Sequence, residues 1–152
     1  MGHSAGGVTD STVFLLLNAI VLPWWGLWLI APRSVWARRA ASHSAIFLVL
    51  CGIYALLFVV VLAERGPAAL DAAGLRAALA SPRGFLLGWS HYVAVDLFVG
   101  AWILRESRRL DVEPRPYLLL AMLLCPLGLG AFLLRRGLRL RSLGQLGEND
   151  LV

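Results

Sequence analysis

The chain has 152 residues, of which 59% are hydrophobic, and its mean hydropathy is +0.75. Soluble domains average roughly 45–50% apolar residues, so a soluble fold of this length could not bury so much apolar surface. The formal charge is +5, and all 14 basic residues are arginines. Because no soluble basic domain is present to carry these charges, the composition excludes a nucleic-acid-binding protein.

Four apolar blocks account for the high share of hydrophobic residues: residues 13–31, 45–63, 85–104 and 117–134. Each is about as long as a helix needs to be to cross a hydrocarbon core of ~30 Å at ~1.5 Å per residue. A helix also satisfies its own backbone hydrogen bonds in lipid, whereas a β-barrel would need short alternating strands. The sequence predicts an all-α integral membrane protein, with one bundle of four transmembrane helices in a domain over 1–136 and a charged, flexible tail over 137–152.

Along the chain, Asp10 and no arginine precede the first block, which therefore lacks the positive region of a signal peptide. Pro32 ends this helix, and "PRSVWARRAAS" is expected to be a short basic turn at the membrane surface. Between the second and third blocks, "RGPAALDAAGLRAALASPRG" is too polar and too short to span the membrane. Its leucines and alanines fall roughly on one side, which predicts a short interfacial amphipathic helix.

Two blocks contain an internal proline, Pro23 in "LPWWGLW" and Pro126 in "LCPLGLG". Each removes one helical hydrogen bond and is expected to kink its helix. The kinks are either ordinary features of membrane helices or the walls of a shared cavity with a polar lining. Cys51 and Cys125 both lie inside apolar blocks, where they match neither a disulfide framework nor a zinc site and are expected to be buried packing residues.

Four crossings would place seven arginines on each side of the membrane. The first helix has arginines only after its end, which favours both termini outside. The absence of lysine indicates a bacterial genome composition, so the expected location is a bacterial inner membrane, with membrane lipid as a partner.

The third block carries His91 and Asp96 near its middle. A charged residue at that depth costs ~2.5–3.5 kcal/mol on insertion scales, so an intramembrane carboxylate indicates a functional role. Five helical steps of ~100° place the two side chains roughly 140° apart. The third helix is therefore polar on two sides and should be the least exposed to lipid. We expect Asp96 to have a polar partner, with these candidates: Asn18, His43, Tyr54 and Arg105.

Other polar residues have simpler interpretations. Asn18 lies mid-span in the first helix, where interhelical hydrogen bonding is expected. His43 and Glu64 mark the two ends of the second helix and are expected to lie at the interface. Three histidines are too few for a di-iron site of the desaturase type, and no metal site is predicted. The six tryptophans form either an aromatic belt or a wall for a flat, conjugated ligand.

The segments "LLLNAIVLPWWGLWLIAP", "GWSHYVAVDLFVGAWILRESRR" and "LLLAMLLCPLGLGAFLLRR" resemble the abscisic-acid-deficient-4-like, or neoxanthin synthase-like, family of small membrane proteins. The resemblance covers about residues 12–136. Its most specific part is G-W-x-H-Y-x-x-x-D-L-F-V-G in the third block. Plant members of the family are linked to the synthesis of neoxanthin from violaxanthin.

This resemblance implies a carotenoid or similar polyene as ligand. The neoxanthin reaction opens an epoxide and forms an allene by losing a proton, which needs an acid and a base but no redox cofactor. Asp96 and His91 match the family pattern, and we assign them as the catalytic pair. The residues expected to bind substrate are Asn18, Trp25, Tyr54, Trp89, Tyr92, Trp102 and Arg105. The protein is thus expected to be an intramembrane isomerase or related redox-neutral enzyme, or alternatively a non-catalytic protein that binds a carotenoid or a partner.

Overall fold

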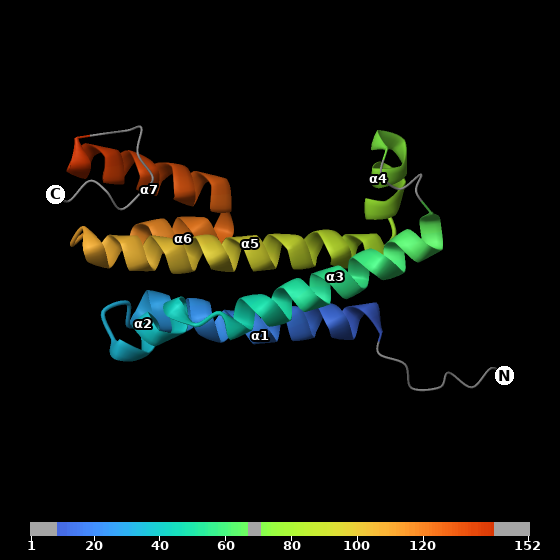
Figure 1. The fold of residues 1–152 in the computed structure, drawn as a ribbon, viewed down its shortest axis with the longest axis horizontal. Helices are drawn as coiled ribbons and strands as arrows, with labels where there is room; N and C mark the ends of the chain where they lie inside the picture. The colour runs from blue at the N-terminus through green and yellow to red at the C-terminus, as the bar shows by residue number, and fades with distance from the viewer. Residues whose placement is uncertain (1–8, 67–70, 142–152) are drawn as a thin grey trace. The chain divides into compact units, whose positions relative to one another are not determined.

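A computed structural model describes residues 9–66 and 71–141, and all the regular structure in these ranges is α-helical (Figure 1). This finding confirms the predicted all-α class. The described helices are α1 (Asp10–Ile30), α2 (Val35–Ser42), α3 (Ala45–Arg65), α4 (Ala72–Leu79), α5 (Pro82–Arg109), α6 (Arg115–Leu123) and α7 (Cys125–Leu140). Most of the predicted flexible tail, from residue 142 onward, lies outside the described residues, and α7 continues through the first part of it to Leu140.

The chain divides into two compact units. The first unit contains Met1–Leu22 and Ser44–Val95, and the second contains Pro23–His43 and Asp96–Val152. The boundaries fall inside the two helices α1 and α5, so each of these helices contributes one part to each unit. His91 and Asp96 consequently belong to different units, although both lie on α5.

Within residues 9–66 and 71–141, three helices are long and apolar enough to cross a membrane: α1, α3 and α5. They correspond to the first three predicted spans. In the most apolar window of α5, 39% of the residues are buried, against 22% in α1 and 17% in α3. The prediction that the third helix is the least exposed of these is therefore confirmed.

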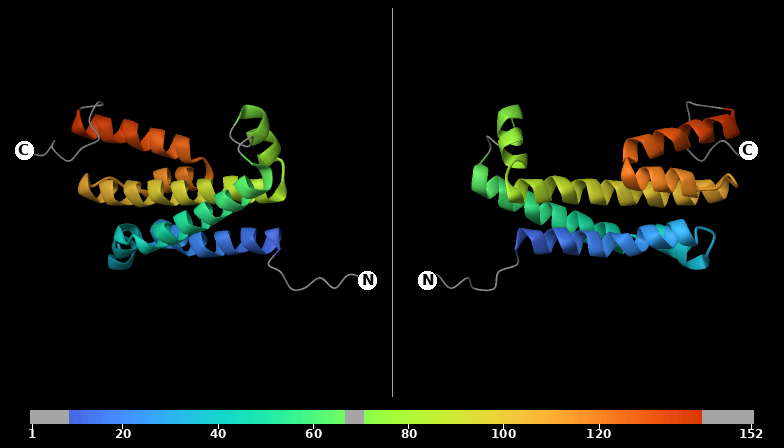
Figure 2. Two further views of the ribbon diagram at one scale, coloured as in Figure 1. Left: turned by 45° about the vertical axis from the view of Figure 1, so that its right-hand side comes forward. Right: turned by 180° about the vertical axis from the view of Figure 1, so that it is seen from behind.

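The fourth predicted span, over residues 117–134, is two helices in the structure. α6 ends at Leu123, the backbone turns at Leu124, and α7 runs back along α6 (Figures 1 and 2). The two helices pack closely, because a Cβ on Gly128 would lie 2.3 Å from the backbone nitrogen of Ala121. Pro126 lies in the first turn of α7, where a backbone N–H would have no acceptor within the helix. The absence of this N–H in proline therefore costs no helical hydrogen bond. Pro126 therefore lies at the start of a helix, and the predicted kink within a helix at this position is wrong. The prediction of a single bundle of four spans is not confirmed.

The predicted basic turn after the first span is also wrong, because residues 35–42 form the helix α2. Ser34 provides the reason: its side-chain oxygen accepts a hydrogen bond from the Ala37 N–H at 3.0 Å, which caps the helix. Ala37 and Ala41 form the buried side of α2. A serine before a run of alanines was the local signal for this helix.

The helix predicted between the second and third spans is confirmed as α4. Asp71 caps it by accepting a hydrogen bond from the Gly74 N–H at 2.6 Å. α4 lies across the beginning of α5 (Figure 1). A Cβ on Gly84 would lie 1.9 Å from the carbonyl oxygen of Ala78, and a Cβ on Gly88 would lie 3.2 Å from the Leu79 side chain. Glycine at these two positions of α5 therefore permits the close approach of α4.

Candidate functional site

A pocket of about 410 Å³ lies in the first unit, between α3, α4 and the first half of α5. Its volume falls in the range of ligand sites, about 300–1,000 Å³. Most of its wall is apolar, and includes Phe58 and Val61 from α3, Leu75 and Leu79 from α4, and Leu87 from α5. A wall of this kind suits a hydrocarbon ligand.

The polar groups of the pocket come from three neighbouring side chains, Tyr54, His91 and Tyr92. Among the described lining residues, these alone have polar side chains. The ring centroids of Tyr54 and His91 are 5.6 Å apart, and those of His91 and Tyr92 are 6.1 Å apart. A phenol can donate or accept a hydrogen bond, and a neutral imidazole has one nitrogen of each kind. The cluster can therefore exchange a proton with a ligand in an otherwise apolar pocket.

Asp96 does not line this pocket. Asp96 lies beside Cys125, the first residue of α7. Cys125 was not among the candidate partners named from the sequence, and those candidates stay predictions. Cys125 is buried, as expected, whereas Cys51 is exposed on α3, so the packing interpretation is wrong for Cys51.

Asn18 and Trp89 lie in the first unit but not in the pocket. The side-chain amide of Asn18 donates to the Phe14 carbonyl oxygen at 2.7 Å, a bond within α1 in place of the expected bond between helices. Trp89 packs against Phe14 and Phe85, with ring centroids 5.1 Å and 6.1 Å away. The contacts of Asn18 and Trp89 described here are therefore with residues of the first unit that do not line the pocket.

Trp25 and Trp102 of the second unit both pack against other aromatic rings. Trp25 is buried and makes an edge contact with Trp28, at 5.7 Å between centroids. A Cβ on Gly100 would lie 2.6 Å from the Trp25 ring, so this motif glycine permits close packing of α5 on α1. Trp102 makes an edge contact with Phe132 at 5.4 Å. Trp25 and Trp102 thus make ring contacts in the second unit and do not line the pocket of the first unit, and their substrate-binding role stays a prediction.

Arginines at the end of α5 and at the start of α6 bind backbone carbonyls at the ends of other helices. Arg105 donates to the carbonyl oxygen of Ala41 in the last turn of α2. Arg115 donates to the carbonyls of Leu29 at 2.9 Å and Ile30 at 3.2 Å, which end α1. Helix C-termini leave such carbonyls without helical partners. Arg105, predicted to bind substrate, thus completes a helix end in the structure.

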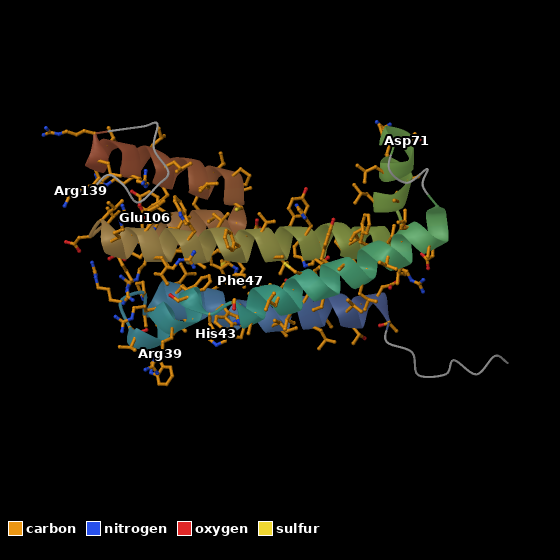
Figure 3. All side chains as sticks on the ribbon, in the orientation of Figure 1. Arg39, His43, Phe47, Asp71, Glu106 and Arg139 are labelled. Atoms are coloured by element: carbon orange, nitrogen blue, oxygen red, sulfur yellow. The ribbon has the colours of Figure 1, made fainter. Side chains whose placement is uncertain are left out.

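A buried ion pair connects α5 to α7, and sequence reasoning missed it. Arg136 Nε lies 2.8 Å from Glu106 Oε1, with 3% and 10% of the two side chains exposed. Figure 3 shows Glu106 on the side of α5 toward α7. The signal in the sequence was a lone glutamate among the arginines of "RESRR". That pattern did not show that Glu106 would be buried.

Of the predicted site residues, the structure thus brings Tyr54, His91 and Tyr92 together. The sequence did not identify the apolar wall from α4, although the amphipathic pattern of that segment was a signal for it. Among the described residues, no three His, Cys, Asp or Glu side chains are grouped so that they could hold a metal ion.

Comparison with known proteins agrees with the motif of the third block. A sequence model of the ABA DEFICIENT 4-like family matches residues 12–132. Protein ABA DEFICIENT 4, chloroplastic, from Arabidopsis thaliana is 23% identical over 130 residues, which cover 78% of this chain and 58% of the plant protein. No solved structure matches the chain. Because the family match extends over most of the sequence, the chain belongs to the ABA DEFICIENT 4-like family.

Proposed function

We propose that the pocket between α3, α4 and α5 binds one oxygenated end group of a carotenoid or similar polyene, and that the protein rearranges this end group without a change of oxidation state. Family membership supports the ligand class, because the family is linked to neoxanthin synthesis. The observation that carries the proposal is the cluster of Tyr54, His91 and Tyr92 in an apolar pocket of about 410 Å³.

The pocket accommodates an end group, and the rest of the polyene extends over the apolar surface of the spans. The ring of the end group packs against Phe58, Leu75 and Leu79. Its oxygen then meets the polar side formed by the two tyrosines and the histidine. Apolar walls with a few placed polar groups are the usual way in which a protein orients such a ligand.

The chemistry that suits this cluster is a paired proton transfer. A proton from an acid reaches the epoxide oxygen, the carbon–oxygen bond breaks, and a base removes a proton from a carbon of the adjoining chain. The electrons of that C–H bond form the new double bond of an allene, and the oxygen remains as a hydroxyl. Substrate and product have the same atoms and electrons, so the step needs no oxidant or reductant. His91 is the proposed base, with Tyr54 placed to donate to oxygen.

Asp96 stays a proposed member of the acid–base apparatus, as its place in the family motif indicates. Its place beside Cys125 gives it a second interpretation, as a group that holds the beginning of α7 to α5. That interpretation suits the alternative function, in which the protein binds the carotenoid without catalysis. The two functions differ in whether His91 and Asp96 are needed for turnover or only for a folded protein.

The test compares His91→Gln, Tyr54→Phe and Asp96→Asn with the parent protein in a host that makes epoxidised carotenoids. Product is measured by chromatography and protein by quantitative immunoblot. Loss of a well-placed acid or base typically lowers the rate ~10²–10⁴-fold, so we expect such a loss in His91→Gln at parental protein level. Turnover at the parental rate in His91→Gln would refute its catalytic role. Pigment binding without product in every protein, including the parent, would establish the non-catalytic alternative.

A further inference from the structure

We infer that a groove in the second unit, between the second part of α1 and helix α2, is a binding site for one anionic phospholipid. The groove has a volume of about 340 Å³. Its wall is formed mainly by Pro23, Trp24 and Leu27 of α1 and by Trp36 and Ala40 of α2. Arg39 and His43 complete it, one helical turn apart at the end of α2 (Figure 3). The site is separate from the proposed polyene pocket and shares no residue with it.

The positive charge of Arg39 in the groove would be balanced by an anion from outside the chain. The Arg39 guanidinium lies over the Trp36 ring, 5.6 Å from its centroid. Within residues 9–66 and 71–141, Arg39 has no carboxylate partner. Four arginines of the unit do have one: Arg33 and Arg115 pair with Glu113, and Arg109 and Arg136 pair with Glu106. A phosphate group held by Arg39 would provide the missing counter-charge.

The apolar part of the groove distinguishes a phospholipid from a free anion. Trp24, Leu27 and Ala40 offer an acyl chain a surface directly beside the cation. α2 also has the form of an interfacial helix, with Ala37 and Ala41 buried and the Trp36 side chain exposed. Tryptophan prefers the headgroup level of a membrane, and arginines near that level attract anionic lipids. The acyl chain would therefore lie in the groove with its phosphate at Arg39.

The experiment titrates phosphatidylglycerol into the purified full-length protein in a neutral detergent and counts bound lipid by native mass spectrometry. Arg39→Gln is compared with Arg38→Gln, which removes the same charge from the neighbouring residue of α2 but does not line the groove. One cation near a lipid headgroup changes affinity about fivefold, so we expect that loss in Arg39→Gln and little change in Arg38→Gln. Phosphatidylcholine should bind all three proteins equally weakly.

A filling variant tests the apolar part. Ala40→Phe leaves the charge unchanged and should also weaken phosphatidylglycerol binding, and Leu27→Trp fills the same groove from α1 if the first variant does not accumulate. Inorganic phosphate added in excess should not displace the lipid. Equal losses in Arg38→Gln and Arg39→Gln would show a diffuse surface charge and overturn the inference. Full displacement by phosphate, or undiminished binding in a folded filling variant, would overturn it as well.

Discussion

At Gly100, the backbone of α5 and the indole of Trp25 are so close that no side chain fits between them. We predict that Gly100→Ala lowers the free energy of unfolding by about 1–3 kcal/mol, the usual cost of overpacking. Gly130→Ala is the matched control, because a Cβ there meets nothing within 4 Å. In that helix, alanine should raise stability by about 0.5–1 kcal/mol. Equilibrium unfolding in mixed micelles measures both, and equal effects of the two substitutions would contradict the close packing at Gly100.

The buried carboxylate Glu106 should matter more than an exposed one. Glu106→Gln leaves the buried Arg136 without its carboxylate, and breaking such a pair typically costs about 3–5 kcal/mol. Glu113→Gln removes a carboxylate whose pairs with Arg33 and Arg115 are exposed, and should cost no more than about 1 kcal/mol. The same unfolding measurement compares these two glutamate substitutions. A loss in Glu113→Gln as large as that in Glu106→Gln would show that burial does not determine the difference.

For single residues, the sequence predicted which side chains lie near a ligand site better than it predicted which residues they contact. His91, Tyr54 and Tyr92 were expected near the ligand, and the structure places them around one pocket. The place of Asp96 beside Cys125 was not expected, because it depends on where the chain turns at Leu124. Arg105 donates a hydrogen bond to the carbonyl oxygen of Ala41 at the end of α2, a contact that the sequence did not predict, and its substrate-binding role stays a prediction.

At the scale of elements, the hairpin of α6 and α7 changes the expected topology. If α1, α3 and α5 cross the membrane and the hairpin returns to the side it left, eleven arginines share one side. They are Arg33, Arg38, Arg39, Arg105, Arg108, Arg109, Arg115, Arg135, Arg136, Arg139 and Arg141. Arg65, Arg76 and Arg83 remain for the other side. Four crossings would divide the arginines equally, so the positive-inside rule favours three crossings with the eleven arginines on the cytoplasmic side.

This topology predicts which positions can be labelled from outside sealed cells. Single cysteines replace Ser11, Ala73, Arg38 and Arg139 in a chain without Cys51 and Cys125, and a membrane-impermeant maleimide is added. Ser11→Cys and Ala73→Cys should react, whereas Arg38→Cys and Arg139→Cys should react only after the cells are opened. If Arg139→Cys and Ser11→Cys both react in sealed cells, the prediction of three crossings is wrong and the chain crosses the membrane four times.

The elements also show which sequence signals were reliable. Three of the long apolar runs correctly predicted helices that are long and apolar enough to span a membrane, because the length of an apolar run relates directly to membrane thickness. Pro23 did not end α1, whereas the run containing Pro126 divides at Leu124. A proline alone does not distinguish a kink from a helix start. In the second case, Gly128 is what lets α7 pack back on α6, and that contact is not visible in a local pattern.

For the whole molecule, the class and the family follow from sequence, while the site depends on long-range packing. The apolar composition and the motif of the third block were sufficient to predict an all-α chain of the ABA DEFICIENT 4-like family. The pocket required α4 to lie on α5, which Gly84 and Gly88 permit. His91 and Asp96 fall in different units, and their cooperation in one acid–base apparatus stays a prediction.

The central claim is that this chain converts a carotenoid end group without a redox change, at the pocket lined by His91. The most direct measurement incubates the purified, reconstituted protein with an epoxidised carotenoid, without added cofactor, and follows the mass and absorption spectrum of the pigment. We expect a product of unchanged mass that carries an allene and a hydroxyl in place of the epoxide, formed by the parent protein and not by folded His91→Gln. A product of altered mass, or equal conversion by His91→Gln, would contradict it.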